Sequence, residues 1–185
     1  MNTLVYSPTI KIKDALPIYF KINDLGDGGY EDKFFKIKLG SFYIPIPNTK
    51  SRLAAVKFHD IHHILTEYPA TWKGEVQIGA WEIASGCGPY FAAWLLNFGS
   101  LAVGLVLYPK TLFNSFMAGR RIKKNLYYHT DYNDDLLNTL VGDLREELCV
   151  TKEKENVLGD YLYFLFWVLF VLVYYFFIYL FIRAI

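Results

Sequence analysis

The strongest constraint on this sequence is an uncharged, apolar stretch near its C-terminal end. From Tyr161 to Ile182 there are 22 consecutive residues without a charge. At 1.5 Å per residue such a helix rises about 33 Å, enough to cross a hydrocarbon core of about 30 Å. The preceding 160 residues could not cover a helix of this kind on every side. We therefore predict a transmembrane anchor over residues 161–183, rather than a buried core helix.

The rest of the chain has the composition of an ordinary globular domain. Residues 1–160 carry 18 Lys and Arg and 18 Asp and Glu, a balance that gives no electrostatic argument for a nucleic-acid partner. Cys87 and Cys149 are too few for a disulfide framework, and we expect both to be reduced. No basic start followed by an apolar region opens the sequence. We thus expect a single-pass membrane protein whose domain lies on the cytoplasmic side.

A second uncharged stretch runs from Ile83 to Tyr108 and is also long enough to span. Two spans would place residues 1–82 and the basic residues after Tyr108 on opposite sides of the membrane, and would export the domain without a signal. We prefer a core helix over 89–108, in which Gly99 and Gly104 allow close packing. A second span is the alternative.

Local patterns predict a mainly α-helical fold. Alternating apolar and polar residues over 34–46 indicate a small β-hairpin, so residues 1–50 form an N-terminal hairpin and loop region. Residues 51–150 form a helical domain that we expect to bind metal and lipid. Its predicted helices cover 51–66, 72–84, 89–108 and 110–124, followed by an amphipathic helix that Asn133 caps.

Three of the four histidines, His59, His62 and His63, lie within five residues. On a helix, His59 and His63 project from one face a turn apart, with Asp60 at its edge. Two imidazoles and a carboxylate so placed can hold one divalent cation, and Glu75 could return to the same point after a helix–turn–helix. The alternative is a group of solvated surface side chains. The order His-Asp, in place of His-Glu, argues against a zincin.

The segment HDIHHILTEYPATWKGE resembles the HDxxH-eleven residues-E motif of the coenzyme Q (ubiquinone) biosynthesis protein four family, and the similarity covers roughly residues 44–148. The resemblance implies a mostly helical fold and a metal bound by His59, Asp60, His63 and Glu75. Zinc is the favoured ion and iron the alternative. It also implies that the protein binds prenylated aromatic lipids at a membrane, and that it replaces the C1 carboxylate of a prenylated hydroxybenzoate by hydroxyl, as a metal-dependent oxidative decarboxylase.

Other residues extend this hypothesis. We expect the prenyl chain to lie along 89–108, and the basic side chains of Arg120, Arg121 and Lys124, with Lys123, to hold an anionic head group or to form a solvated face. Glu67 stands where the family often has glycine, and we interpret it as a solvated turn residue rather than a fifth ligand.

Expected partners are membrane lipid, other enzymes of quinone biosynthesis and a second copy of the chain. Two other functions stay open. One is a non-catalytic scaffold that binds prenyl lipid, and the other is a membrane metal hydrolase unrelated to quinones.

Overall fold

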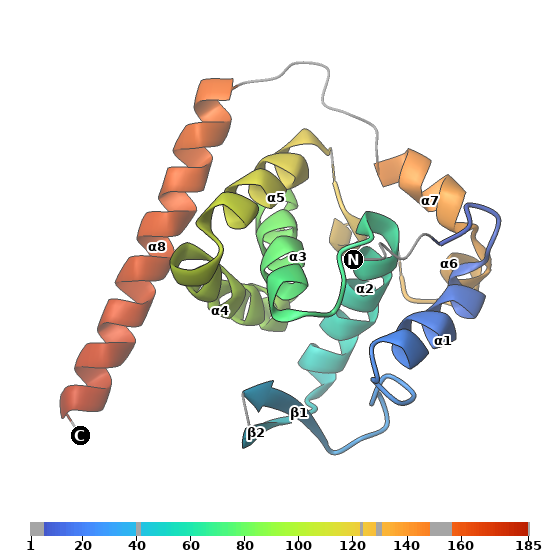
Figure 1. Cartoon of the computed structure of the whole chain (residues 1–185), viewed down its shortest axis with the longest axis horizontal. Coiled ribbons are helices and arrows are strands. Elements are labelled where there is room, and N and C mark those ends of the chain that lie inside the picture. Colours follow the sequence, from blue (N-terminus) through green and yellow to red (C-terminus); the bar gives the residue numbers. More distant parts are fainter. Residues whose placement is uncertain (1–5, 40–41, 123, 129–130, 149–156, 185) are drawn as a thin grey trace.

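The protein is mainly helical, with a small hairpin near the N-terminus and a long apolar helix at the C-terminal end, as the sequence predicts (Figure 1). The computed structural model describes residues 6–39, 42–122, 124–128, 131–148 and 157–184. In these residues the elements follow in the order α1 (Ile12–Ile22), β1 (Phe34–Leu39), β2 (Phe42–Pro47), α2 (Lys50–Thr66), α3 (Trp72–Ser85), α4 (Phe91–Leu107), α5 (Pro109–Arg121), the 3-10 turn η1 (Leu126–Tyr128), α6 (Asp134–Asn138), α7 (Val141–Leu148) and α8 (Val157–Ala184).

Helix α3 is the centre of the domain and packs mainly against α5 and α4 (Figure 1). Glycines permit these close approaches. A Cβ on Gly119 of α5 would overlap the carbonyl oxygen of Trp81 and lie 2.9 Å from Cβ of Ala84, and one on Gly104 of α4 would lie 2.6 Å from Val76. Such contacts leave no room for a side chain at Gly104 or Gly119. The two glycines therefore let α4 and α5 pack closely against α3.

Local capping explains where α2 and α3 begin. The Thr49 side chain accepts a hydrogen bond from the Arg52 amide (3.2 Å), and Thr71 accepts one from the Gly74 amide (3.2 Å). Helix α2 ends at Thr66, and the next residue, Glu67, is left-handed with φ 60°. The predicted helices over 51–66 and 72–84 are confirmed within one residue at each end.

The predicted hairpin is confirmed. Strands β1 and β2 are antiparallel, with Phe34 opposite Pro47 and Leu39 opposite Phe42. Pro45 and Pro47 cannot donate to a ladder, and a two-stranded ribbon with open edges tolerates them.

The N-terminal region contains a helix that the sequence patterns did not predict. Helix α1 forms despite Pro17 in its interior and packs against α2 and α6. It buries apolar residues at helical spacing, namely Ile12, Ala15, Leu16, Tyr19 and Phe20. The region before the hairpin therefore contributes to the hydrophobic core.

The predicted amphipathic helix after Asn133 is two helices, α6 and α7, which is a correction. The chain between them pairs with the N-terminal segment: Leu140 forms an antiparallel bridge with Lys11, and Thr139 accepts from the Ile12 amide at 3.0 Å. This contact across the sequence interrupts a pattern that is helical when considered locally.

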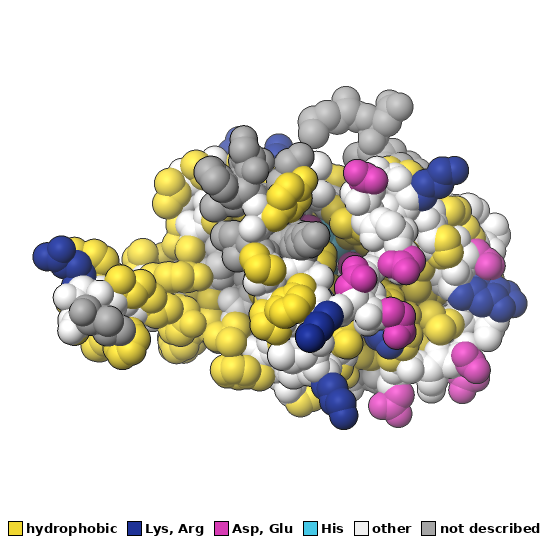
Figure 2. All heavy atoms as spheres, turned by 90° about the horizontal axis from the view of Figure 1, so that it is seen from below, with side chains coloured by type: hydrophobic (Ala, Val, Ile, Leu, Met, Phe, Trp, Pro, Cys, Tyr) yellow, Lys and Arg dark blue, Asp and Glu magenta, His cyan; other side chains and the backbone are white. Residues whose placement is uncertain are grey.

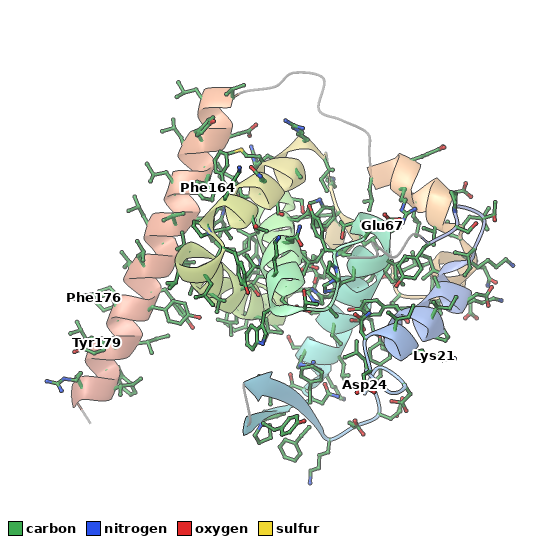
Figure 3. All side chains as sticks on the ribbon, in the orientation of Figure 1. Lys21, Asp24, Glu67, Phe164, Phe176 and Tyr179 are labelled. Atoms are coloured by element: carbon green, nitrogen blue, oxygen red, sulfur yellow. The ribbon has the colours of Figure 1, made fainter. Side chains whose placement is uncertain are left out.

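Helix α8 lies along the outside of the domain against α4 and α5 (Figure 1). Among the described residues it is the one helix long and apolar enough to cross a membrane, and only its Val171 is buried. Phe164 points toward the domain, whereas Phe176 and Tyr179 point away from it (Figure 3). Helix α4 has 17 residues and buries one face in the core, which agrees with the predicted core helix over 89–108.

We expect Gly119→Ala to weaken the fold, because its methyl group would meet the backbone of α3. The free energy of unfolding should fall by about 1–3 kcal/mol, measured by thermal unfolding of the full chain in detergent. Gly99→Ala is the matched control, since a Cβ there meets only the Tyr175 hydroxyl at 3.6 Å. Equal stability of the two variants would contradict the tight α3–α5 contact.

Candidate metal centre

The turn between α2 and α3 brings three side chains to one point. His59 and His63 lie a turn apart on α2, and Glu75 lies in the first turn of α3. The two Nε2 atoms are 3.1 Å apart, and the Glu75 carboxylate oxygens lie 3.4 Å from each of them. Gly74 makes the tight turn possible, because a Cβ there would overlap the carbonyl oxygen of Pro69. The helix–turn–helix predicted for His59, His63 and Glu75 is thus formed.

The hydrogen bonds on the far side of each imidazole fix its tautomer. Nδ1 of His59 lies 3.0 Å from Oε1 of Glu82, and Nδ1 of His63 lies 2.8 Å from the backbone carbonyl of Tyr68. An ionised carboxylate and a carbonyl can only accept, so both Nδ1 atoms carry the proton. In neutral rings both Nε2 lone pairs therefore face each other and the Glu75 carboxylate. This arrangement is repulsive unless a cation, either a metal ion or a proton, lies between them.

The three groups fit a metal ion. Their ligand atoms all lie within 4.8 Å of one another. Ligand atoms bound tetrahedrally at about 2.0–2.1 Å, as zinc binds them, are about 3.3–3.4 Å apart, close to the spacings here. The Glu75 side chain is 41% exposed and that of His59 21%, so the site opens to one side. Three protein ligands with an open position are typical of a catalytic rather than a structural zinc site.

Glu82 supports the site from beneath. Its side chain is fully buried and accepts from His59, from Nδ1 of His62 (2.7 Å) and from the Asn97 amide (2.7 Å). Tyr127 donates to it from η1 at 3.2 Å. A carboxylate that holds the far nitrogen of a metal-binding histidine fixes the ring and makes the near nitrogen a better ligand.

His62 belongs to this buried network and not to the metal group. Its Nδ1–H donates to Glu82, while its Nε2 accepts from the Leu126 amide at 3.2 Å. Burial lowers the pKa of His62, so the ring is neutral. His62 thus leaves α2 on a different side from the Nε2 atoms of His59 and His63, and is not one of the three converging groups.

The charges of His59, Glu75 and Glu82 depend on one another. Burial alone lowers the pKa of His59, but Glu82 and Glu75 outweigh it and raise this pKa well above the ordinary value. Desolvation opposes ionisation of the fully buried Glu82 and, beneath its exposed edge, of Glu75, yet the neighbouring histidines hold both carboxyl pKa values below their usual range. Without a metal, His59 therefore takes a proton between two carboxylates.

Asp60 lies outside the group of three. Its carboxylate accepts a hydrogen bond of 2.6 Å from the Tyr30 hydroxyl. Burial raises the pKa of Asp60 to about 6, although nearby His59 partly offsets the shift. One residue along a helix turns by about 100°, so Asp60 and His59 leave α2 in different directions. Its role as a ligand stays a prediction.

The other predicted residues lie elsewhere. Glu67 accepts from Arg145 of α7 at 2.8 Å and is not part of the metal group. Arg120 donates to Asp160 of α8 at 2.7 Å and stacks over Tyr163, so it joins α5 to α8. Arg121 and Lys124 are exposed near the end of α5. Cys87 is buried and unpaired, and Lys123 and Cys149 lie outside the described residues.

The sequence carried a signal for Glu82 that motif reasoning missed. It follows Glu75 by seven residues, or two helical turns, and is the only charged residue from Val76 to Ala84. A single carboxylate within a buried apolar helix needs partners, and clustered histidines nearby are suitable ones.

Comparisons with models of protein families, with curated proteins and with solved structures give no match.

We expect Glu82→Gln to lower the affinity for zinc by about 10–100-fold. Glutamine keeps the shape but loses the charge that orients His59. Affinity is measured by competition with a chromophoric chelator, and circular dichroism verifies the fold. Glu31→Gln, at an exposed site, is the control. Equal zinc affinity in the two variants would show that Glu82 does not contribute to metal binding.

Zinc affinity should also fall as the pH falls, because a proton on Nε2 of His59 competes with the metal. The pKa of His59 is raised well above the ordinary value of 6.5, so the loss should begin at a pH above that value, at up to about tenfold per pH unit. Proton release on zinc addition in weak buffer provides the measurement. An affinity that is constant above pH 7 would refute the raised pKa.

Proposed function

We propose that this protein is a membrane-attached metalloprotein that acts on a prenylated aromatic lipid of the hydroxybenzoate type. The observation that supports it most is the convergence of His59, His63 and Glu75 with both histidine tautomers fixed for metal binding. The open side of this site leaves room for a ligand oxygen. The apolar helix α8 supplies a means of staying at the membrane. Zinc is the favoured ion, with iron as the alternative.

The proposed reaction replaces the C1 carboxylate of the aromatic ring by hydroxyl. The C1–carboxylate bond breaks with release of CO2, and water supplies the hydroxyl oxygen. Two electrons and two protons therefore leave the substrate and are taken by an external oxidant such as dioxygen, which becomes hydrogen peroxide. A bound metal would act as a Lewis acid toward a carboxylate or phenolate oxygen of the head group. Within the chain, Glu82 holds His59 in place, and Asp60, with a pKa of about 6, is suited to exchange a proton beside the site.

Metal analysis of the purified full chain tests the first half of the proposal. We expect about one ion per chain, and its loss in His63→Ala and in Glu75→Gln, which remove a nitrogen and a charged oxygen from the site. Glu31→Gln is the matched control for the carboxylate and should keep the ion. Metal content unchanged in both site variants would refute the ligand assignment.

A prenylated hydroxybenzoate labelled with 13C in its carboxylate tests the second half. The metal-loaded protein in lipid vesicles should release labelled CO2, and Glu75→Gln should lose this activity. Mass spectrometry of lipids that purify with the protein runs alongside. Bound prenyl lipid without CO2 release would favour the scaffold. Hydrolysis of a soluble ester, with no bound lipid, would favour the unrelated hydrolase.

A further inference from the structure

Helix α4 has an outward side that carries no charge. From Ile83 to Tyr108 the sequence contains no Asp, Glu, Lys or Arg, and the large side chains exposed on α4 are all apolar: Phe91, Leu95, Leu96, Val106 and Leu107. Val106 is 78% exposed. A helix on the surface of a water-soluble domain normally carries polar residues on its outer face. The outer face of α4 is therefore unlike a surface in contact with water.

Helix α8 packs against α4 beside this exposed face, along Trp94 and Phe98. Trp94 stacks on Trp167 with ring centroids 5.0 Å apart, and Phe98 contacts Phe170 at 5.2 Å and Tyr174 at 5.7 Å. Nearer its start, α8 is held to α5 by the ion pair between Asp160 and Arg120. These contacts extend over about 20 Å of α8. Apolar side chains cover α8 and continue onto the adjoining part of the domain (Figure 2).

We infer that the outer face of α4 is embedded in the hydrocarbon of the bilayer together with α8. Helix α4 contacts Trp167, Phe170 and Tyr174 near the middle of α8, so the middle of α8 cannot enter the apolar phase while α4 stays in water. If hydrocarbon surrounds α8, it therefore also surrounds the outer face of α4. The inference rests on the membrane placement of α8 in the proposed function, and it adds that the domain itself is partly immersed.

Helix α4 links the buried network beneath the metal centre to the packing against α8. Its Asn97 side-chain amide donates to Glu82, and Glu82 in turn holds His59. Trp94, one turn before Asn97 on the same helix, contacts Trp167 of α8. The immersed helix therefore also supplies a donor to the network that supports the centre.

Nitroxide labels on the full chain in lipid vesicles test the inference. Single cysteines replace Leu95 and Val106 on α4, Leu165 on the exposed side of α8, and Ile18 on α1, with Cys87 and Cys149 changed to alanine. Helix α1 lies across the domain from α8 (Figure 1), so Ile18 is the matched exposed apolar control. Paramagnetic relaxation measures collisions of each label with oxygen, which enters hydrocarbon, and with a water-soluble nickel chelate.

Labels at 95 and 106 should behave like the one at 165, with frequent oxygen collisions and loss of nearly all nickel collisions, while the label at 18 meets the nickel chelate. If the labels at 95 and 106 collide with the nickel chelate as the label at 18 does, while the label at 165 lies in hydrocarbon, the inference about α4 fails. The membrane placement of α8 is then still supported. If the label at 165 also collides with the nickel chelate, the membrane placement of α8 fails too. Labels at 95 shielded from both reagents and broadened by one another would show that a second copy covers α4, which also overturns the inference.

Discussion

A carboxylate removed from water must be balanced by donors, and Glu82 is the carboxylate on which this domain depends. Its burial costs several kcal/mol unless donors surround it. The donors come from three other elements: α2 supplies His59 and His62, α4 supplies Asn97, and η1 supplies Tyr127. One buried charge on α3 thus ties together the helices that build the site. It also decides which nitrogen of His59 faces Glu75, so the fold and the metal chemistry share a single interaction.

The parts of the fold that could be predicted are those governed by nearby residues. The caps Thr49 and Thr71, the alternation over 34–46 and the uncharged stretch from Tyr161 to Ile182 each act within a few turns of chain, and each element is present. Helix α1 and the break between α6 and α7 could not be predicted in this way. The break arises because Leu140 pairs with Lys11, two residues far apart in the sequence, and α1 is stabilised by burial against α2 and α6 despite Pro17.

In the candidate site, too, some features follow from nearby residues and others depend on tertiary contacts. The pairing of His59 with His63 follows from helical periodicity, and the return of Glu75 needs only a short turn. Whether Asp60 joins them depends on what else its carboxylate can bind, and Tyr30, thirty residues earlier, provides a partner. The contribution of Glu82 depends on Asn97 and Tyr127 from other elements. Spacing identifies residues that can converge, whereas their competing partners are set by tertiary structure.

Helix α4 contacts both the buried polar network and the apolar helix α8. A centre built from two imidazoles and ionised carboxylates cannot lie in hydrocarbon without a large desolvation cost, while α8 and the outer face of α4 cannot face water without an opposite cost. Helix α4 meets both conditions, because Asn97 donates to Glu82 while Trp94, one turn earlier, contacts Trp167 of α8. Gly79 of α3 and Gly104 of α4 allow these two helices to pack closely, because a Cβ on Gly79 would lie 2.6 Å from Ser100 and one on Gly104 2.6 Å from Val76.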